Sequence, residues 1–121
     1  MSDVVTPLQV ERRLLELGRE LDDSYKSCSD AERLYMDAKS RWEIASARAR
    51  MSIKDRAAKG GYKVTVAEVE DEALLRCQDE LLALNGAEAV VKAMRANMVR
   101  VRTQIDIARS LGTSVRAAFE G

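Results

Sequence analysis

The sequence predicts an all-α protein, built as a long antiparallel helical hairpin that resembles a coiled coil and assembles into an oligomer. The composition is the first observation: aromatic residues make up only 4% of the 121 residues and proline occurs once, a profile typical of long helices. The second observation is a helical spacing of apolar residues in two long segments. The third is the pair Gly60-Gly61 between them, because glycine readily takes the left-handed conformation that ends a helix.

The first helix is expected at about residues 7–58. Thr6 and Gln9 predict its start as a capping box around Pro7, a residue suited to the first helical position. A second capping-box pattern follows Cys28, so a break near 27–29 is an alternative to one continuous helix. Large side chains occupy one seven-residue row (Leu14, Leu21, Cys28, Tyr35, Trp42, Ala49) and mostly small ones the next (Leu17, Ser24, Ala31, Ala38, Ala45, Ser52).

A loop at 59–65 is expected to lead into a second long helix at about 66–111. Thr65 and Glu68 have the spacing of a further capping box, which marks the start of this helix. A long helix, a short loop and a second long helix form an αα-hairpin when the loop is this short.

The apolar spacing changes along the second helix. Apolar residues recur every four positions from Val69 and settle into a 3-4 repeat from Leu84, a stutter that relaxes supercoiling. Gly112 is expected to separate a short C-terminal helix at about 113–120. We expect one helical domain over 1–121, and oligomerisation because a two-helix hairpin has little core of its own.

Charge is distributed in blocks, although Lys and Arg equal Asp and Glu over the whole chain. Residues 39–63 carry eight basic and two acidic side chains, and residues 64–90 carry one basic and seven acidic ones. Folding at Gly60-Gly61 would place the basic block beside "EVEDE" (68–72), where ion pairs worth about 0.2–1 kcal/mol each could set the register.

The basic block also suggests a phosphate-binding surface, because one acidic helix cannot neutralise cations that point in several directions. Lys59 and Lys63 lie in the loop beside Tyr62, whose ring could stack on a base. The candidate nucleic-acid contacts are therefore Arg48, Arg50, Lys54, Arg56, Lys59, Tyr62 and Lys63.

Several classes of function are not expected. The chain has no histidine, the usual acid/base group and commonest metal ligand near neutral pH, so we predict no enzyme, no metal site and no cofactor. Cys28 and Cys77 have no CxxC spacing and are expected to be reduced packing residues. The start "MSDVVTPLQVERR" lacks the pattern of a signal peptide and no apolar run approaches ~18 residues, so we expect a cytoplasmic protein without a membrane partner.

Three segments carry a family resemblance: "ASARARMSIKDR" (45–56), "AAKGGY" (57–62) and "QIDIARSLGTSVRAAFEG" (104–121). In pattern and order this part of the chain resembles the phage UvsY-type recombination mediators. The resemblance implies a non-enzymatic accessory protein of homologous recombination in the host cytoplasm. It would form a ring-like homo-oligomer, bind single-stranded DNA and help to load a recombinase onto strands covered by single-strand-binding protein.

The resemblance also assigns roles by position. Arg48 and Arg50 would be the first DNA contacts, with Lys54 and Arg56 next. C-terminal residues of this family hold the ring together, and the apolar repeat extends that surface. The expected assembly residues are Trp42, Met94, Met98, Val101, Ile105, Leu111, Val115 and Phe119.

Two alternatives need no DNA. The apolar repeat and the charge blocks suit a structural or scaffolding coiled coil of a phage virion or its assembly. They also suit a helical regulator that binds a host protein by laying a helix in a groove.

Overall fold

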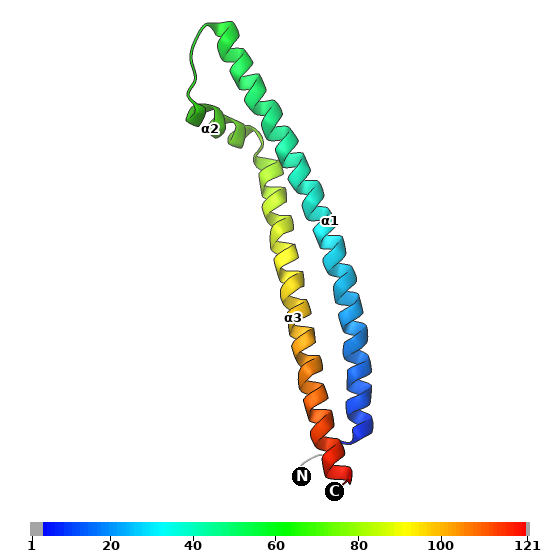
Figure 1. The fold of residues 1–121 in the computed structure, drawn as a ribbon. Coiled ribbons are helices and arrows are strands. Elements are labelled where there is room, and N and C mark those ends of the chain that lie inside the picture. Colours follow the sequence, from blue (N-terminus) through cyan, green and yellow to red (C-terminus); the bar gives the residue numbers. More distant parts are fainter. Residues whose placement is uncertain (1–3, 121) are drawn as a thin grey trace. The chain divides into compact units, whose positions relative to one another are not determined.

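The computed structural model describes residues 4–120, which form three helices joined by short connections (Figure 1). Helix α1 spans Pro7–Gly60, α2 spans Val66–Arg76 and α3 spans Gln78–Glu120. No strand occurs within the described part of the chain. The predicted all-α class is therefore confirmed.

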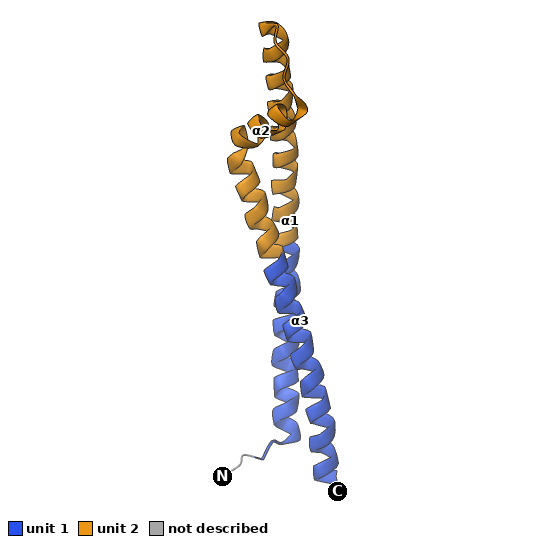
Figure 2. Cartoon of the chain, turned by 90° about the vertical axis from the view of Figure 1, so that its left-hand side faces the viewer, with its two compact units in different colours: residues 1–30, 92–121 blue, residues 31–91 orange. Residues whose placement is uncertain are grey.

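The chain divides into two compact units (Figure 2). Unit 1 comprises residues up to Asp30 and from Lys92 onward, and unit 2 comprises Ala31–Val91. Helices α1 and α3 are each divided between the two units, whereas α2 belongs to unit 2 alone.

Helix α1 begins at the predicted capping box. The Thr6 amide donates a hydrogen bond of 2.9 Å to Gln9 Oε1, and the Gln9 amide donates one of 3.3 Å to Thr6 Oγ1. The helix then continues through 27–29, so the alternative of a break there is wrong. Cys28 and Ala31 are both buried, which shows that an unbroken helix keeps its apolar row on one face.

A Schellman motif ends α1. Gly61 has a φ of 70°, its amide donates to the Ala58 carbonyl at 3.3 Å, and the Tyr62 amide donates to the Ala57 carbonyl at 3.1 Å. Thr65 then caps α2 by accepting a hydrogen bond of 3.1 Å from the amide of Glu68.

The second half of the chain departs from the predicted helix boundaries at two positions. The helix expected at 66–111 is interrupted at Cys77, which separates α2 from α3. The residue leaves the helical conformation but keeps its hydrogen bonds, since its amide donates to Ala73 and its carbonyl accepts from Leu81, both at 3.0 Å. The break falls within the four-residue apolar spacing, before the 3-4 repeat begins at Leu84.

Gly112 does not end a helix, and the separate helix expected at 113–120 is instead the last part of α3. A Cβ atom at Gly112 would lie 3.0 Å from Val10 Cγ1. The missing side chain therefore lets α1 and α3 approach closely within unit 1, which is a packing role.

Unit 1 is an antiparallel pair of helical segments. Its interhelical contacts include the hydrogen bond from Asn97 Nδ2 to Ser24 Oγ, at 2.9 Å, and the ion pair of Arg100 with Glu20, at 2.8 Å. As the residue numbers rise along α3, those of the α1 partners fall, so the segments run in opposite directions. A small buried cluster lies between them and comprises Leu17, Val101 and Ala108.

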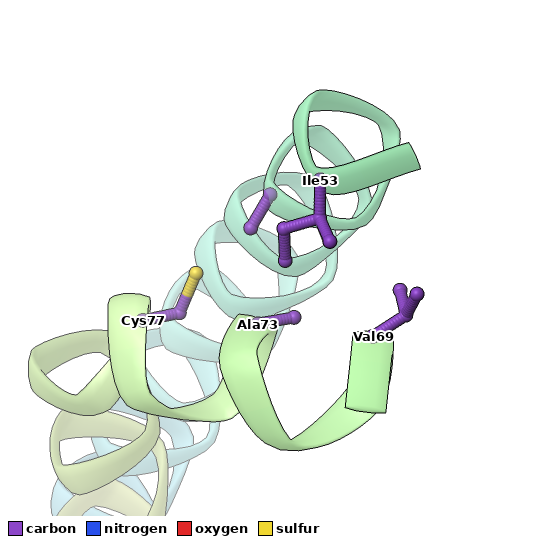
Figure 3. Packing of buried hydrophobic residues seen from close by; sticks show 5 residues of the cluster. Ile53, Val69, Ala73 and Cys77 are labelled. Atoms are coloured by element: carbon purple, nitrogen blue, oxygen red, sulfur yellow. The ribbon is translucent and has the colours of Figure 1, made fainter. Parts of the chain in front are cut away.

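Unit 2 has its own cluster, in which the end of α1 packs on α2. Figure 3 shows Ile53 of α1 beside the row of Val69, Ala73 and Cys77. Ala49 completes the buried set, and the half-buried Trp42, Ala45 and Val64 pack against it. These residues hold the basic end of α1 against the acidic helix α2.

Candidate nucleic-acid interface

The basic end of α1 forms ion pairs with α2, as the charge blocks predicted. Arg56 Nη2 donates to both carboxylate oxygens of Glu72, at 2.8 and 3.0 Å. Arg50 Nε lies 3.8 Å from Glu70 Oε1, a long and solvent-accessible pair. Arg76, which sequence reasoning missed, joins this group by pairing with Glu72 at 3.6 Å and donating to Ser52 at 3.3 Å.

Tyr62 is tied to the same group. Its hydroxyl accepts a hydrogen bond of 3.1 Å from Arg56 Nε, and its ring covers Gly60, where a Cβ atom would come within 2.6 Å of the ring. Hydrogen bonds to Glu72 and then to Tyr62 raise the pKa of the Arg56 guanidinium above its ordinary value. The tyrosine thus anchors the turn, while 48% of its surface stays exposed.

The seven predicted contacts fall into two groups. Arg50, Arg56 and Tyr62 are engaged with neighbouring side chains as described, and Lys59 pairs with Asp55 at 3.0 Å. The other group consists of exposed cations that form no ion pair with any of residues 4–120, namely Arg48, Lys54 and Lys63.

The unpaired cations do not lie on one face. Arg48 and Lys54 are six residues apart on α1, so they project about 120° from one another around the helix. Lys63 lies in the turn that follows. A flexible strand that passes around this end of α1 could contact all three, whereas a flat surface could not.

The exposed side chains of the basic turn suit phosphate contacts. Within residues 4–120 no group of three or more Cys, Asp or Glu side chains could hold a metal ion. Exposed ammonium and guanidinium groups contact phosphates without reading sequence, and a half-exposed tyrosine offers a stacking surface.

The predicted assembly residues differ in their burial. Val101 is fully buried and Val115 is 8% exposed, both inside unit 1, so neither side chain is open to a second copy. Leu111 and Phe119 are exposed on α3. The remaining four are half-buried: Trp42 in unit 2, and Met94, Met98 and Ile105 in unit 1.

Unit 2 also contains a groove that sequence reasoning missed. Two adjoining hollows of about 330 and 280 Å³ lie between α1 and the start of α3, and Arg41 and Glu80 line both of them. Leu34, Arg41 and Arg48 follow one another every seven residues, a signal that could have revealed one wall of the groove. We call this feature the α1–α3 groove, and its other lining residues are Asp37, Ala38, Ile44, Ala45, Asp79 and Ala83.

None of the helices in the described part of the chain combines the length and apolar character needed to cross a bilayer. Neither a protein-family model, nor a curated protein, nor a solved structure matches this chain.

Proposed function

We propose that the protein is a non-enzymatic, oligomeric accessory protein that binds single-stranded DNA through its basic turn, residues 48–63, in the manner of a recombination mediator. One observation carries this proposal. Arg48, Lys54 and Lys63 are exposed and have no ionic partner in the described chain, although acidic side chains of α2 lie nearby. These three cations are therefore available for phosphates.

The ion pairs of the turn do not oppose such binding. The Arg50 side chain is 35% exposed and its partner Glu70 56% exposed, and surface pairs of this kind contribute only about 0.2–1 kcal/mol. A phosphate can therefore displace Glu70 from Arg50 at a cost of only that free energy. Binding of this kind is independent of sequence and weakens with salt, because the phosphates release counterions when they are neutralised.

The proposal includes a long antiparallel hairpin that self-associates. The antiparallel contacts of unit 1 support the hairpin. Large apolar side chains at exposed positions support self-association, since a chain in water covers such groups when it can. Leu15 is 64% exposed in unit 1, and Met51 and Leu75 are 71% and 72% exposed in unit 2.

Titration of a fluorescently labelled oligo(dT) strand tests the DNA part. Replacing Arg48, Lys54 and Lys63 together with Ala should lower the affinity at least ~10-fold and reduce the salt slope by about 2, since each lost phosphate contact removes about 0.7. The matched control is the triple Ala variant of Arg12, Arg19 and Lys26, exposed cations on the unit 1 segment of α1.

The control variant should bind like the wild type. Equal losses in the two triple variants would show that the basic turn is not the site. A wild-type chain that does not bind the strand at low salt would exclude the proposed function altogether.

A scaffolding coiled coil is the second candidate. The pairing of Arg50 and Arg56 with α2 favours it, because this pairing gives part of the basic block a structural role without any ligand. An oligomer that persists at all salt concentrations and shows no strand binding would select this candidate over the first.

A further inference from the structure

The α1–α3 groove of unit 2 has an apolar floor that is open to solvent. Leu34 is 60% exposed and Ile44 is 53% exposed, and the small side chains of Ala38, Ala45 and Ala83 leave room above the backbone. Because both hollows share Arg41 and Glu80, they form one continuous feature. Its apolar lining, which is open to solvent, suits a helix better than a small molecule.

The rims of the groove carry unpaired charges of opposite sign. Arg41 and Arg48 lie on α1, and Asp79 and Glu80 lie on α3. None of these four side chains forms an ion pair within residues 4–120, although Arg41 and Glu80 line the same hollows. Asp37 is the one acidic residue on the α1 side.

We propose that a second copy of this chain occupies the groove, with unit 2 packing face to face on unit 2 of its partner. The two copies would be related by a two-fold axis parallel to the helices, so that α1 of each lies on α3 of the other. Arg41 lies at the level of Glu80, since both line both hollows. This rotation places Arg41 of one copy opposite Glu80 of the second copy, twice in the dimer.

The charges select this arrangement over its main competitor. A two-fold axis perpendicular to the helices would place α1 on α1, and at the level of the groove it would bring the Arg41 side chains of the two copies together. Like charges across an interface are unfavourable, whereas opposite charges fix the orientation and register of the partners. Each copy would also cover Leu34 and Ile44 of the other.

The exposed area is large enough for such an interface. The chain has a mass of 13.5 kDa and an accessible surface of 8974 Å². A compact monomer of this mass exposes about 6,500 Å², which leaves roughly 2,400 Å² of additional surface. A specific interface of standard size buries about 800 Å² on each partner, so the excess of the whole chain, to which the groove contributes a part, can supply it.

Charge reversal tests the arrangement, with the dimer dissociation constant measured by sedimentation equilibrium in the absence of DNA. Arg41→Glu should raise this constant at least ~10-fold, because the reversal acts at two symmetric positions. Glu80→Arg should do the same. The double variant Arg41→Glu/Glu80→Arg should return to within about 3-fold of the wild type, since the pairing is restored with inverted signs.

Lys54→Glu is the matched control: it reverses another exposed, unpaired cation of α1 that does not line the groove. It should leave the constant within about 2-fold of the wild type. Circular dichroism checks that each variant keeps its helices. Single reversals without effect, or a double variant no better than the singles, would overturn the inference.

The inference rests on the oligomeric part of the proposed function. Its test needs no DNA, although Arg48 belongs both to the rim of the groove and to the basic turn. A wild-type chain that stays monomeric would overturn both the groove interface and self-association. An oligomer insensitive to the reversals would overturn the groove interface alone. Rescue by the double variant in a chain that does not bind oligo(dT) would support the groove interface and exclude the DNA function.

Discussion

The two units use the same long helix α1 but pack it in different ways. In unit 1, α1 follows its seven-residue repeat against the 3-4 repeat of α3, and the cluster of Leu17, Val101 and Ala108 lies between them. In unit 2, the buried residues at the end of α1 recur every four positions, as do those of α2 and Cys77. Matching spacings on the two partners determine which helical segments pack together.

Polar contacts differ between the units as well. Unit 1 places polar groups within its helical interface, namely the Asn97–Ser24 hydrogen bond and the buried Gln104 Oε1, which has no hydrogen-bond partner among residues 4–120. Unit 2 keeps its ion pairs at the exposed margin of an apolar cluster. Both units have exposed ion pairs between helical segments, and unit 1 adds a side-chain hydrogen bond within its helical interface.

The largest effect is expected from a charge in the interior of unit 1. Val101→Asp should lower the free energy of unfolding by about 4 kcal/mol, because a fully buried position would receive an unpaired carboxylate. Urea unfolding followed by circular dichroism measures this loss. Hydrogen exchange would show whether the opening is confined to unit 1.

Val99→Asp is the control, since Val99 lies on the same helix and is 60% exposed. It should change the free energy by less than about 0.5 kcal/mol. Equal effects of the two substitutions would contradict the burial of Val101.

A cavity in unit 2 should have a smaller effect. Ile53 is 1% exposed, so Ile53→Ala should cost about 2–3 kcal/mol of unfolding free energy. Met51→Ala, two residues away at a position that is 71% exposed, should cost little. If amide exchange after Ile53→Ala rises in unit 1 as much as in unit 2, the two units do not open separately.

Replacing the glycines of α3 with alanine should change the free energy of unfolding by about 1 kcal/mol, with opposite expectations at Gly86 and Gly112. Gly86→Ala should stabilise the protein by up to about 1 kcal/mol, because the added methyl group meets nothing within 4 Å and glycine is unfavourable inside a helix. Gly112→Ala should gain less or destabilise, because its methyl group would lie 3.0 Å from Val10. Thermal melts of both variants decide the order, and an equal gain at both would show that the close approach at Gly112 is absent.

The surface ion pairs should give the smallest effects. A double-mutant cycle on Glu20 and Arg100, which are 2.8 Å apart, should yield a coupling of about 0.5 kcal/mol that decreases with added salt. The same cycle on Arg50 and Glu70, at 3.8 Å, should yield less. A stronger coupling at Arg50 would mean that the pairs of unit 2 contribute more than their geometry indicates.

Helix ends were predictable from sequence where their signals are local. Thr6 with Gln9 and Thr65 with Glu68 form the expected caps, and Gly61 ends α1. The interruption at Cys77 and the continuity through Gly112 depend on the packing of distant segments, which local patterns do not contain. Gly112 in particular has the sequence pattern of a helix end, and only its contact with Val10 shows its packing role.

For the candidate site, the pairing of the basic end of α1 was predictable from the sequence, but the identity of the unpaired cations was not. The charge blocks indicated that the basic end of α1 would pair with "EVEDE", and Arg50 and Arg56 do so. A cation of α1 stays unpaired when its side chain projects away from α2, so the outcome depends on how α1 is rotated about its axis. That rotation follows from the packing of Ile53 and its neighbours, and the sequence alone does not reveal it.

The hydrogen bond between Asn97 and Ser24 protects the chain against misalignment. If α3 slipped by one heptad along α1, the Asn97 amide would lie beside Leu17 or Ala31, whose side chains accept no hydrogen bond. Asn97 is half-buried, and a fully buried amide left unsatisfied would cost about 1–3 kcal/mol, so the slipped form is disfavoured by up to that amount. This polar contact therefore favours the observed alignment over shifted ones, between which the repetitive apolar rows alone would discriminate less.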